Sequence, residues 1–226
     1  MNKISNSVLW NIYNNAIHMI KERNYKIGEY ITSFKIFNLA IKNKDFIIIK
    51  CEYLTKNINV ILYFKENVFR ENDMKSIINN TTSKIKHLIL IIDASITSRI
   101  LKKKEKYPNL KIEFIGHNIF YIHITKHWLV PKHILLNKKE MVSLYNTSIT
   151  TNTLNILDSN EDFYKNAIKY NQNMRKIFNT DSISMWYGAQ PGNIFKIIRN
   201  SGKWPGLNQI SYSLVIDSKY IDYKKK

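Results

Sequence analysis

Short runs that are apolar on both faces of a strand constrain the fold of this chain more than any other feature. The run Ile58 to Phe64 alternates large apolar residues on one face, and Ile61 and Tyr63 make its other face apolar as well. The run His87 to Ile92 is continuously apolar and ends at Asp93. Strands of this kind need cover on both sides. The sequence therefore predicts a sheet that is buried between two other layers.

Helical patterns separate these runs along the first half of the chain. Ser7 to Arg23 places apolar residues at helical spacing behind a serine that can cap the helix. The predicted order is helix Ser7 to Arg23, strands Phe46 to Ile49 and Ile58 to Phe64, helix Asp73 to Lys84, strand His87 to Ile92, helix Ser95 to Tyr107, and strands Leu110 to Ile115 and Ile119 to Ile124 with a hairpin at Gly116-His117-Asn118. This order predicts the mixed α/β class, with a three-layer domain and a mixed sheet over residues 1–126.

The second half of the chain has shorter elements between turns. Asn137 can cap a helix, and Glu140 three residues later completes a variant of the capping box. Asp181 can cap another helix, which Gly188 would end. The predicted elements are helices Asn137 to Tyr145 and Asp181 to Tyr187, a turn at Pro191-Gly192-Asn193, and strands Ile194 to Arg199 and Ile210 to Ile216. They predict a small α+β domain over residues 127–226, with an insertion within about 146–173.

The chain is strongly basic, with 35 Lys and Arg against 17 Asp and Glu and a net charge of +18. Such a charge favours a nucleic-acid neighbourhood, because phosphates attract it without regard to sequence. The 30 Lys against 5 Arg, together with 38 Ile and 28 Asn, are equally typical of an A/T-rich genome. Proteins that read bases use more Arg. Both explanations of the charge therefore stay open.

Several classes of protein are excluded or disfavoured because the residues or motifs that they need are scarce or missing. The single cysteine, Cys51, excludes a disulfide framework and a thiolate zinc site, and we expect it to be a small buried side chain. No apolar run approaches the roughly 20 residues of a membrane span, and no secretory signal is visible. Neither a Gly-x-Ser-x-Gly elbow nor a Gly-rich phosphate loop is present. These features favour an intracellular protein without a nucleotide cofactor.

Four histidines fall close together: His117, His123, His127 and His133. A strand that presented His123 and His127 on one face would suit zinc. No cysteine lies nearby, however, and the nearest acid is Glu113. The simpler interpretation is a set of imidazoles at the surface or at the edge of the core, with His133 held by backbone contacts.

Two further classes bind or cut nucleic acid. A metal-dependent nuclease would gather Asp45 and Glu52 around Mg²⁺, but its Asp-x-Lys or Glu-x-Lys partner is missing from the predicted strands. A free-standing DNA-binding module would use the run Lys102, Lys103 and Lys104, although no known readout motif surrounds it. A solvated helix end explains this run as well.

The segment HWLVPKHILLN at 127–137 resembles the LVPKH signature of the fifth-largest subunit shared by eukaryotic RNA polymerases I, II and III, a family that also has an archaeal branch. The similarity continues at MRKIFNTD (174–181), MWYG (185–188), PGN (191–193), KIIR (196–199) and SYSLV (211–215). In the first half, LW at 9–10 and MIKERNY at 19–25 resemble the family's opening helix. Archaeal members lack the front domain, so the chain is similar to the eukaryotic type.

This resemblance implies a non-catalytic structural subunit of a multisubunit DNA-directed RNA polymerase, without a metal or cofactor of its own. The front domain would form part of the lower jaw near downstream duplex DNA, with Lys102, Lys103 and Lys104 close to it. The back domain would dock on the largest subunit. The expected interface residues are Val130, Pro131, His133, Asp181, Tyr187, Gly188, Lys196, Arg199 and Tyr212. Lys196 and Arg199 fall on opposite faces of their strand, and each residue of the set could instead belong to the core of its own domain.

The chain departs from the family pattern at several positions. Ser182 stands where the family has Pro, Met174-Arg175 replaces Leu-Pro, and Ser213 replaces Arg. Together with the A/T-rich composition, this divergence indicates a large DNA virus or a fast-evolving eukaryote. The implied location is the nucleus for a cellular protein, and the virion or a cytoplasmic virus factory for a viral one. The implied partners are polymerase subunits and DNA, with neither a membrane nor a second copy of the chain.

Overall fold

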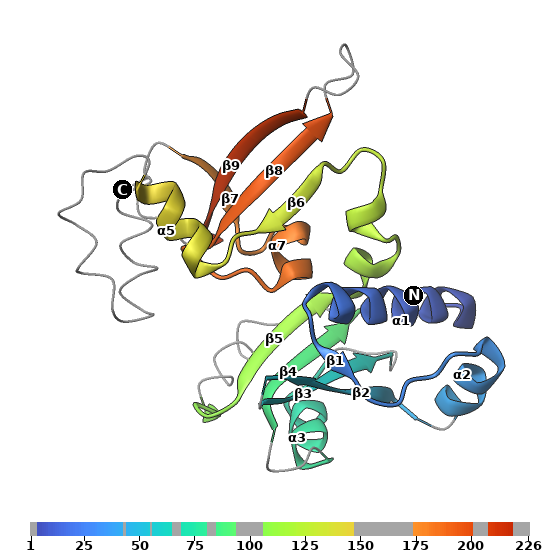
Figure 1. Cartoon of the computed structure of the whole chain (residues 1–226). Coiled ribbons are helices and arrows are strands. Elements are labelled where there is room, and N and C mark those ends of the chain that lie inside the picture. The colour runs from blue at the N-terminus through green and yellow to red at the C-terminus, as the bar shows by residue number, and fades with distance from the viewer. Residues whose placement is uncertain are drawn as a thin grey trace, which may run out of the picture. The chain divides into compact units, whose positions relative to one another are not determined.

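The computed structural model describes residues 4–42, 44–54, 56–64, 69–80, 85–93, 106–146, 174–200 and 208–218. The chain divides into two compact units, Met1–His123 and Ile124–Lys226. Each unit has its own sheet (Figure 1). Each also has its own buried side chains. The mixed α/β class that the sequence predicts is confirmed.

The first unit is built on a five-stranded sheet in the order β1-β2-β3-β4-β5. Its strands are β1 (Lys26–Ile27), β2 (Phe46–Tyr53), β3 (Lys56–Tyr63), β4 (Ile85–Ile92) and β5 (Lys111–Gly116). β2 pairs antiparallel with both β1 and β3, whereas β3, β4 and β5 are parallel to one another. The sheet is therefore mixed, as predicted.

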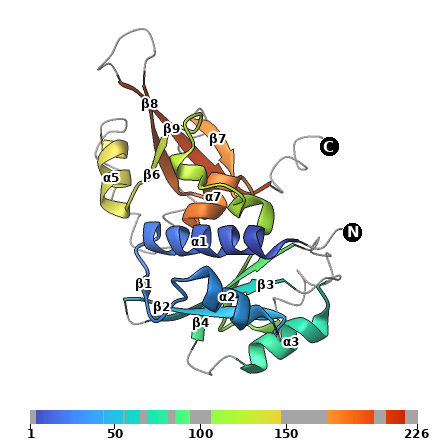
Figure 2. The same ribbon diagram turned by 90° about the vertical axis from the view of Figure 1, so that its right-hand side faces the viewer.

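Helices cover both faces of this sheet, with α1 (Asn6–Glu22) on one side and α3 (Glu71–Asn80) on the other (Figures 1 and 2). Ile61 and Tyr63 of β3 pack into the cluster that also holds the buried side chains of α3. The alternate residue Leu62 faces the opposite side and is equally buried. The two-faced apolar pattern thus predicted the three layers correctly.

Local signals explain where α1 begins and ends. The Ser5 hydroxyl accepts a hydrogen bond from the Val8 N–H at 3.4 Å, and Arg23 is the C-cap. Two other elements of this unit, β1 and α2 (Phe34–Ile41), were not predicted from the sequence. The helix predicted from Ser95 to Tyr107 lies almost entirely outside the described residues.

The hairpin predicted at Gly116-His117-Asn118 and the strand predicted from Ile119 to Ile124 are wrong. The chain instead forms two 3-10 turns, η2 (His117–Phe120) and η3 (Ile124–Lys126). Asn15 Nδ2 of α1 donates to the Phe120 carbonyl oxygen at 2.8 Å. This contact holds η2 against α1, so tertiary packing overrides the local preference for a strand.

The second unit is built on a four-stranded sheet in the order β6-β8-β9-β7. Its elements are β6 (Lys132–Leu135), α5 (Lys138–Asn146), β7 (Arg175–Phe178), α7 (Ser182–Tyr187), β8 (Ile194–Asn200) and β9 (Asn208–Ile216). β8 pairs antiparallel with β6 and β9, and β7 runs parallel to β9. Apolar residues of α5 and α7 join two clusters on opposite faces of this sheet.

The predicted caps of this unit are confirmed. The Asn137 N–H donates to Glu140 Oε2 at 2.7 Å, and the Glu140 N–H donates to Asn137 Oδ1 at 3.0 Å. Asp181 Oδ1 accepts from the Ile183 N–H at 2.9 Å, and Gly188 ends α7 with a φ of 65°. Gly192, with a φ of 93°, makes the predicted turn before β8.

Candidate interaction surfaces

The predicted interface residues of the second unit divide between the two faces of its sheet. Val130 and Tyr187 pack against the cluster on the α7 side. Tyr212 packs against the cluster on the α5 side, and Lys196 is its cross-strand partner. Arg199 lies on the opposite face of β8 from Lys196, as its alternation predicts. The predicted residues therefore belong to two different surfaces.

On the α7 side, the predicted residues support the core of the unit. The Tyr187 ring centroid lies 5.8 Å from that of Phe195, which is fully buried. Val130 is half-buried against the same cluster. Asp181 and Gly188 begin and end α7. These side chains fix the position of α7 on the sheet.

His133 is held as an oriented, neutral imidazole. Its Nδ1 lies 2.7 Å from the Pro131 carbonyl oxygen, and because a carbonyl only accepts, Nδ1 carries the proton. Its ring meets Phe195 edge-on at 5.8 Å. Burial lowers the pKa of His133, an effect that Pro131 and Asp181 oppose and Arg199 reinforces. The predicted backbone contact of His133 is confirmed.

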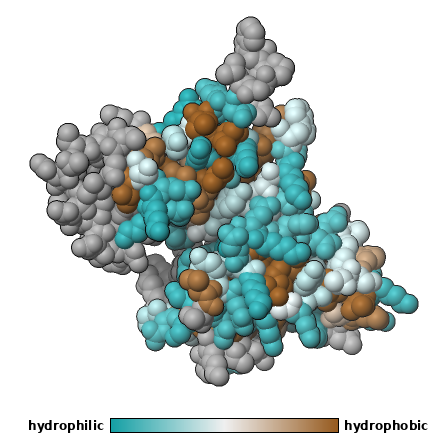
Figure 3. Space-filling model, viewed as in Figure 1, coloured by the Kyte–Doolittle hydropathy of each residue, from teal (hydrophilic) through white to brown (hydrophobic). Residues whose placement is uncertain are grey.

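On the α5 side, the sheet presents two cross-strand rows that the helix covers only in part. One row pairs Ile134 with Lys196 and Lys196 with Tyr212, and the next pairs Lys132 with Ile198 and Ile198 with Ile210. We call these residues the open face: Lys132, Ile134, Lys196, Ile198, Ile210 and Tyr212. Ile210 is 50% exposed, and Figure 3 shows hydrophobic side chains gathered over β8. The open face thus combines aliphatic and aromatic surface with two ammonium groups.

Two large apolar side chains are exposed just before β6. Trp128 is 84% exposed and Leu129 is 65% exposed. A turn fixes their backbone, since the Val130 N–H donates to the His127 carbonyl oxygen at 2.9 Å. The His127 ring stacks on Trp128 with centroids 6.3 Å apart. Exposed side chains of this size on an ordered turn are typical of protein contacts.

The four clustered histidines occupy separate environments. His117 is buried in η2, and burial lowers its pKa. His123 Nε2 lies 3.6 Å from Glu22 Oε1, whereas His127 and His133 belong to the second unit. The proposed strand with His123 and His127 on one face does not form, because η3 lies there. Among the described residues, no three His, Cys, Asp or Glu side chains are grouped to hold a metal ion.

The two acids of the nuclease alternative lie at opposite ends of β2. Asp45 precedes this strand and Glu52 is near its end, so the rise of a strand separates them by about 23 Å. That separation is too large for two carboxylates to share one Mg²⁺. The nuclease alternative is therefore not supported.

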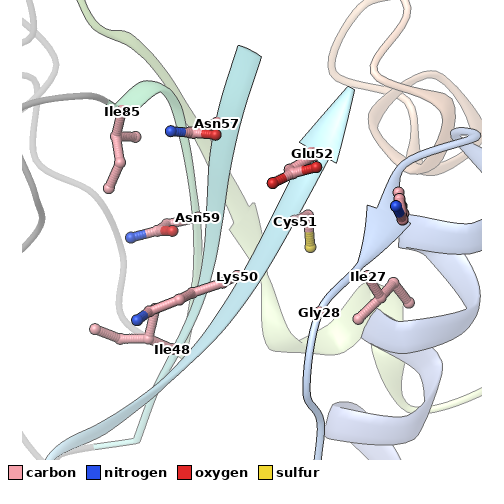
Figure 4. A pocket seen from close by; sticks show the side chains of 10 residues that line it. Ile27, Gly28, Ile48, Lys50, Cys51, Glu52, Asn57, Asn59 and Ile85 are labelled. Carbon is pink, nitrogen blue, oxygen red and sulfur yellow. The ribbon is translucent and has the colours of Figure 1, made fainter. Parts of the chain in front are cut away.

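Glu52 instead lines a cavity of about 410 Å³ beside β1 and β2 (Figure 4). Its polar wall includes Lys50, Asn57 and Asn59, next to Cys51. Burial raises the pKa of the Cys51 thiol to about 12, so this sulfur is protonated at neutral pH. The prediction of Cys51 as a small buried side chain is confirmed.

Some site residues were not predicted, and others lie outside the part of the chain that the structure describes. Lys102, Lys103 and Lys104 are among the latter. Ile198 was expected on the same small sheet as Lys196, Arg199 and Tyr212, whereas Ile210 was not singled out from the sequence, because its exposure depends on the pairing of β8 with β9. The alternation of Lys196 with apolar neighbours was the available signal. Each helix in the described part of the chain is too short or too polar to span a lipid bilayer.

Comparison with known proteins gives a consistent result over most of the chain. Residues 122–212 match the family described as RNA polymerase Rpb5, C-terminal domain. A protein named DNA-directed RNA polymerase RPB5 homolog, from African swine fever virus, is 25% identical over 194 residues, covering 80% of this chain and 85% of that protein. The DNA-directed RNA polymerase V subunit 5A of Arabidopsis thaliana is 22% identical over 193 residues, covering 81% of this chain and 78% of that protein. The resemblance stated from the motifs is confirmed.

Proposed function

We propose that the chain is an RNA polymerase subunit of the Rpb5 type, a non-catalytic part of the enzyme that docks on the largest subunit through its second unit. Its first unit contributes to the lower jaw beside downstream DNA. The match of residues 122–212 to the Rpb5 C-terminal domain is the observation that carries this proposal. Other polymerase subunits are its partners by virtue of the family.

We assign the docking contact to the open face. Its aliphatic rows are only half covered, so their removal from water by a partner would stabilise the complex. Lys196 and Tyr212 then touch the largest subunit directly, with Ile198 and Ile210 beside them. The other predicted residues contribute indirectly, because they maintain the fold of the unit that presents this face. They are Val130, Pro131, His133, Asp181, Tyr187 and Gly188.

Charge reversals on the two faces of β8 test the docking proposal. We expect Lys196→Glu to lower co-purification of the tagged chain with the two largest polymerase subunits about tenfold. Arg199→Glu is the matched control, since it makes the same charge change on the opposite face of the same strand and should have little effect. Quantitative mass spectrometry of native polymerase measures both. Equal retention of the two variants would contradict docking through the open face.

The jaw proposal rests on charge and on the family. A net charge of +18 attracts duplex DNA through counterion release, without reading its sequence. Replacing Lys102, Lys103 and Lys104 by Gln in the assembled polymerase should weaken binding to all downstream sequences alike. The slope of log affinity against log salt should decrease by roughly 0.9 for each phosphate that the variant no longer neutralises. An unchanged slope would remove these lysines from the DNA interface.

The proposed role also predicts the activity of the isolated chain and its location in the cell. The isolated chain should incorporate no nucleotide, because catalysis belongs to the largest subunits. Its location follows that of its polymerase: the nucleus for a cellular enzyme, and the cytoplasmic factory or the virion for a viral one. Nucleotide incorporation by the purified chain would overturn the non-catalytic assignment.

A further inference from the structure

The outward face of α2 exposes apolar side chains in the first unit. Ile36 is 55% exposed and Leu39 is 65% exposed, and only Phe37 of this helix is buried. Ile36 and Leu39 are three residues apart, so they are neighbours on the surface of the helix. Figure 3 shows hydrophobic side chains at the place of α2 in Figure 1. This surface is distinct from the open face, which lies in the other unit.

Aromatic packing holds α2 in place from its inner side. The Phe37 ring lies 5.2 Å from the Trp10 ring and 5.3 Å from the Tyr13 ring, both on α1. The Ile31 N–H donates to the Tyr13 hydroxyl at 2.8 Å, which fixes the chain just before the helix. The outward side chains therefore belong to a helix that is already held in place. A partner that binds them loses little free energy to ordering of this helix.

Lysines border the exposed apolar pair. Lys35 and Lys42 are both exposed and seven residues apart, so they lie along the same side of the helix as Leu39. Lys44 follows and is also exposed, and α2 itself contains no acidic residue. We call Lys35, Ile36, Leu39 and Lys42 the α2 patch. It pairs two aliphatic side chains with two neighbouring positive charges.

We propose that the α2 patch binds an acidic amphipathic segment of a partner protein. Apolar side chains at helical spacing on such a segment would cover Ile36 and Leu39, and its carboxylates would meet Lys35 and Lys42. This is the mode in which a short helix lies along a hydrophobic surface with charges at the rim. The proposal is independent of docking on the largest subunit.

The same chemistry disfavours two other occupants. Two copies of the chain related by a twofold axis would bring the lysines of one α2 patch against those of the other, which is repulsive. Duplex DNA would use Lys35 and Lys42 but would leave Leu39 without an apolar partner. A partner with both carboxylates and apolar side chains satisfies the whole α2 patch.

Peptide binding to the full-length chain tests this inference. The probe is a fluorescent designed helical peptide with leucines at helical spacing and glutamates around them. A second peptide keeps the glutamates but has serine in place of leucine. We expect Leu39→Asp to weaken binding of the first peptide about tenfold by fluorescence anisotropy. Leu54→Asp is the matched control, because Leu54 is 82% exposed in the same unit and lies outside α2.

Charge and fold are tested in parallel. Lys35→Glu should also weaken the first peptide about tenfold, whereas Lys86→Glu, an exposed lysine of β4, should not. Circular dichroism checks that each variant is folded. If Leu39→Asp does not fold, Lys35→Glu still tests the inference. Much weaker binding of the serine peptide supports the inference.

Three results would overturn it. Equal binding of the leucine and serine peptides would mean that charge alone attracts the probe. Loss of duplex DNA binding in Lys35→Glu, without any effect of either variant on the peptide, would assign the α2 patch to nucleic acid. A dimer in sedimentation that Leu39→Asp dissociates would assign it to a second copy of the chain.

Discussion

The central strands β3 and β4 of the first unit are buried on both faces, whereas β8 and β9 of the second unit lose cover toward one end. Val60 and Ile61 are adjacent in β3, face opposite layers, and are both fully buried. In the second unit, Ile198 and Ile210 are cross-strand partners, and Ile210 is half exposed. The central strands of one sheet are closed between two helical layers, and the other sheet leaves apolar surface exposed.

This difference teaches where each unit obtains its stability. The first unit relies on apolar burial across three layers and on the cluster of charged side chains around the partly buried Glu113. Within the described residues, fewer apolar side chains are buried in the second unit than in the first. Local devices also define its structure, such as the capping box at Asn137 and Glu140 and the left-handed Gly188. Substitutions in the closed sheet should therefore cost more than equivalent substitutions on the open face.

The largest expected effect is on the closed sheet. Leu90→Ala removes a side chain with no exposed surface from the middle of β4. The resulting cavity should lower the free energy of unfolding by about 3 kcal/mol. Ile210→Ala on the open face should cost under about 1 kcal/mol, because water already reaches this side chain. Urea denaturation of both variants measures the contrast, and equal losses would contradict the assignment of one sheet as closed and the other as open.

The next effect concerns the buried charge cluster at Glu113 in the first unit. Arg23 Nη1 donates to Glu113 Oε2 at 2.8 Å, and Lys111 Nζ and His87 Nε2 lie 2.8 and 3.1 Å from Oε1. Arg23→Met keeps much of the volume but leaves the carboxylate short of its buried partner. We expect a loss of about 3 kcal/mol in the free energy of unfolding at neutral pH. Lys111→Met is the control and should cost less, because Lys111 is half exposed.

The same cluster predicts how stability depends on pH. Burial opposes ionisation of Glu113, but Arg23, His87 and Lys111 outweigh it and hold its pKa well below the usual range. The unfolded chain then binds a proton that the folded chain does not, so stability present at neutral pH is lost as the pH falls below about 4.3. Urea denaturation between neutral and acidic pH should show this loss. In Glu113→Gln it should be smaller in that range, and an unchanged profile would contradict the assignment.

Histidine contributes in a separate pH range. Burial lowers the pKa of His87, although Glu113 opposes the shift. Because the folded pKa lies below the unfolded one, stability is lost as the pH falls through about 6.5 toward the folded value. The loss in this range should decrease in His87→Gln. A profile of His87→Gln that matches the parent chain there would show that this histidine does not contribute.

Prediction from the sequence succeeded where local or periodic signals decide the structure. Burial on both faces was visible in the run Ile58 to Phe64, and the caps at Asn137 and Asp181 follow from their side-chain oxygens. It failed at Ile119 to Ile124, where a contact from Asn15 of α1 decides the conformation. Such a contact joins residues 105 positions apart, and no local pattern reveals it.

Two of the missed elements, β7 and α2, depend on contacts with residues that are distant in the sequence. β7 pairs with β9, which follows it only after α7 and β8. α2 lacks a side-chain cap at Ser33 and depends on Phe37 packing against α1. The motif near β6 was recognised, but the division of the interface residues between two sheet faces required the register of β8 with β9. Motifs thus indicated the candidate residues, and strand pairing determined on which face of the sheet each one lies.

The smallest effect sharpens the comparison at a single backbone position of the second unit. Gly188 has a φ of 65°, where a side chain is disfavoured, and its N–H donates to the Met185 carbonyl oxygen at 3.2 Å. We expect Gly188→Ala to lower the free energy of unfolding by about 1 kcal/mol, and Gly188→Asn to cost less because Asn tolerates this conformation. Urea denaturation compares the two variants.

Since Gly188 also ends the helix that packs behind Phe195, the alanine variant should weaken docking only as far as it loosens the sheet. A larger loss of docking than of stability would place Gly188 in direct contact with the partner and would move the interface from the open face to the α7 side.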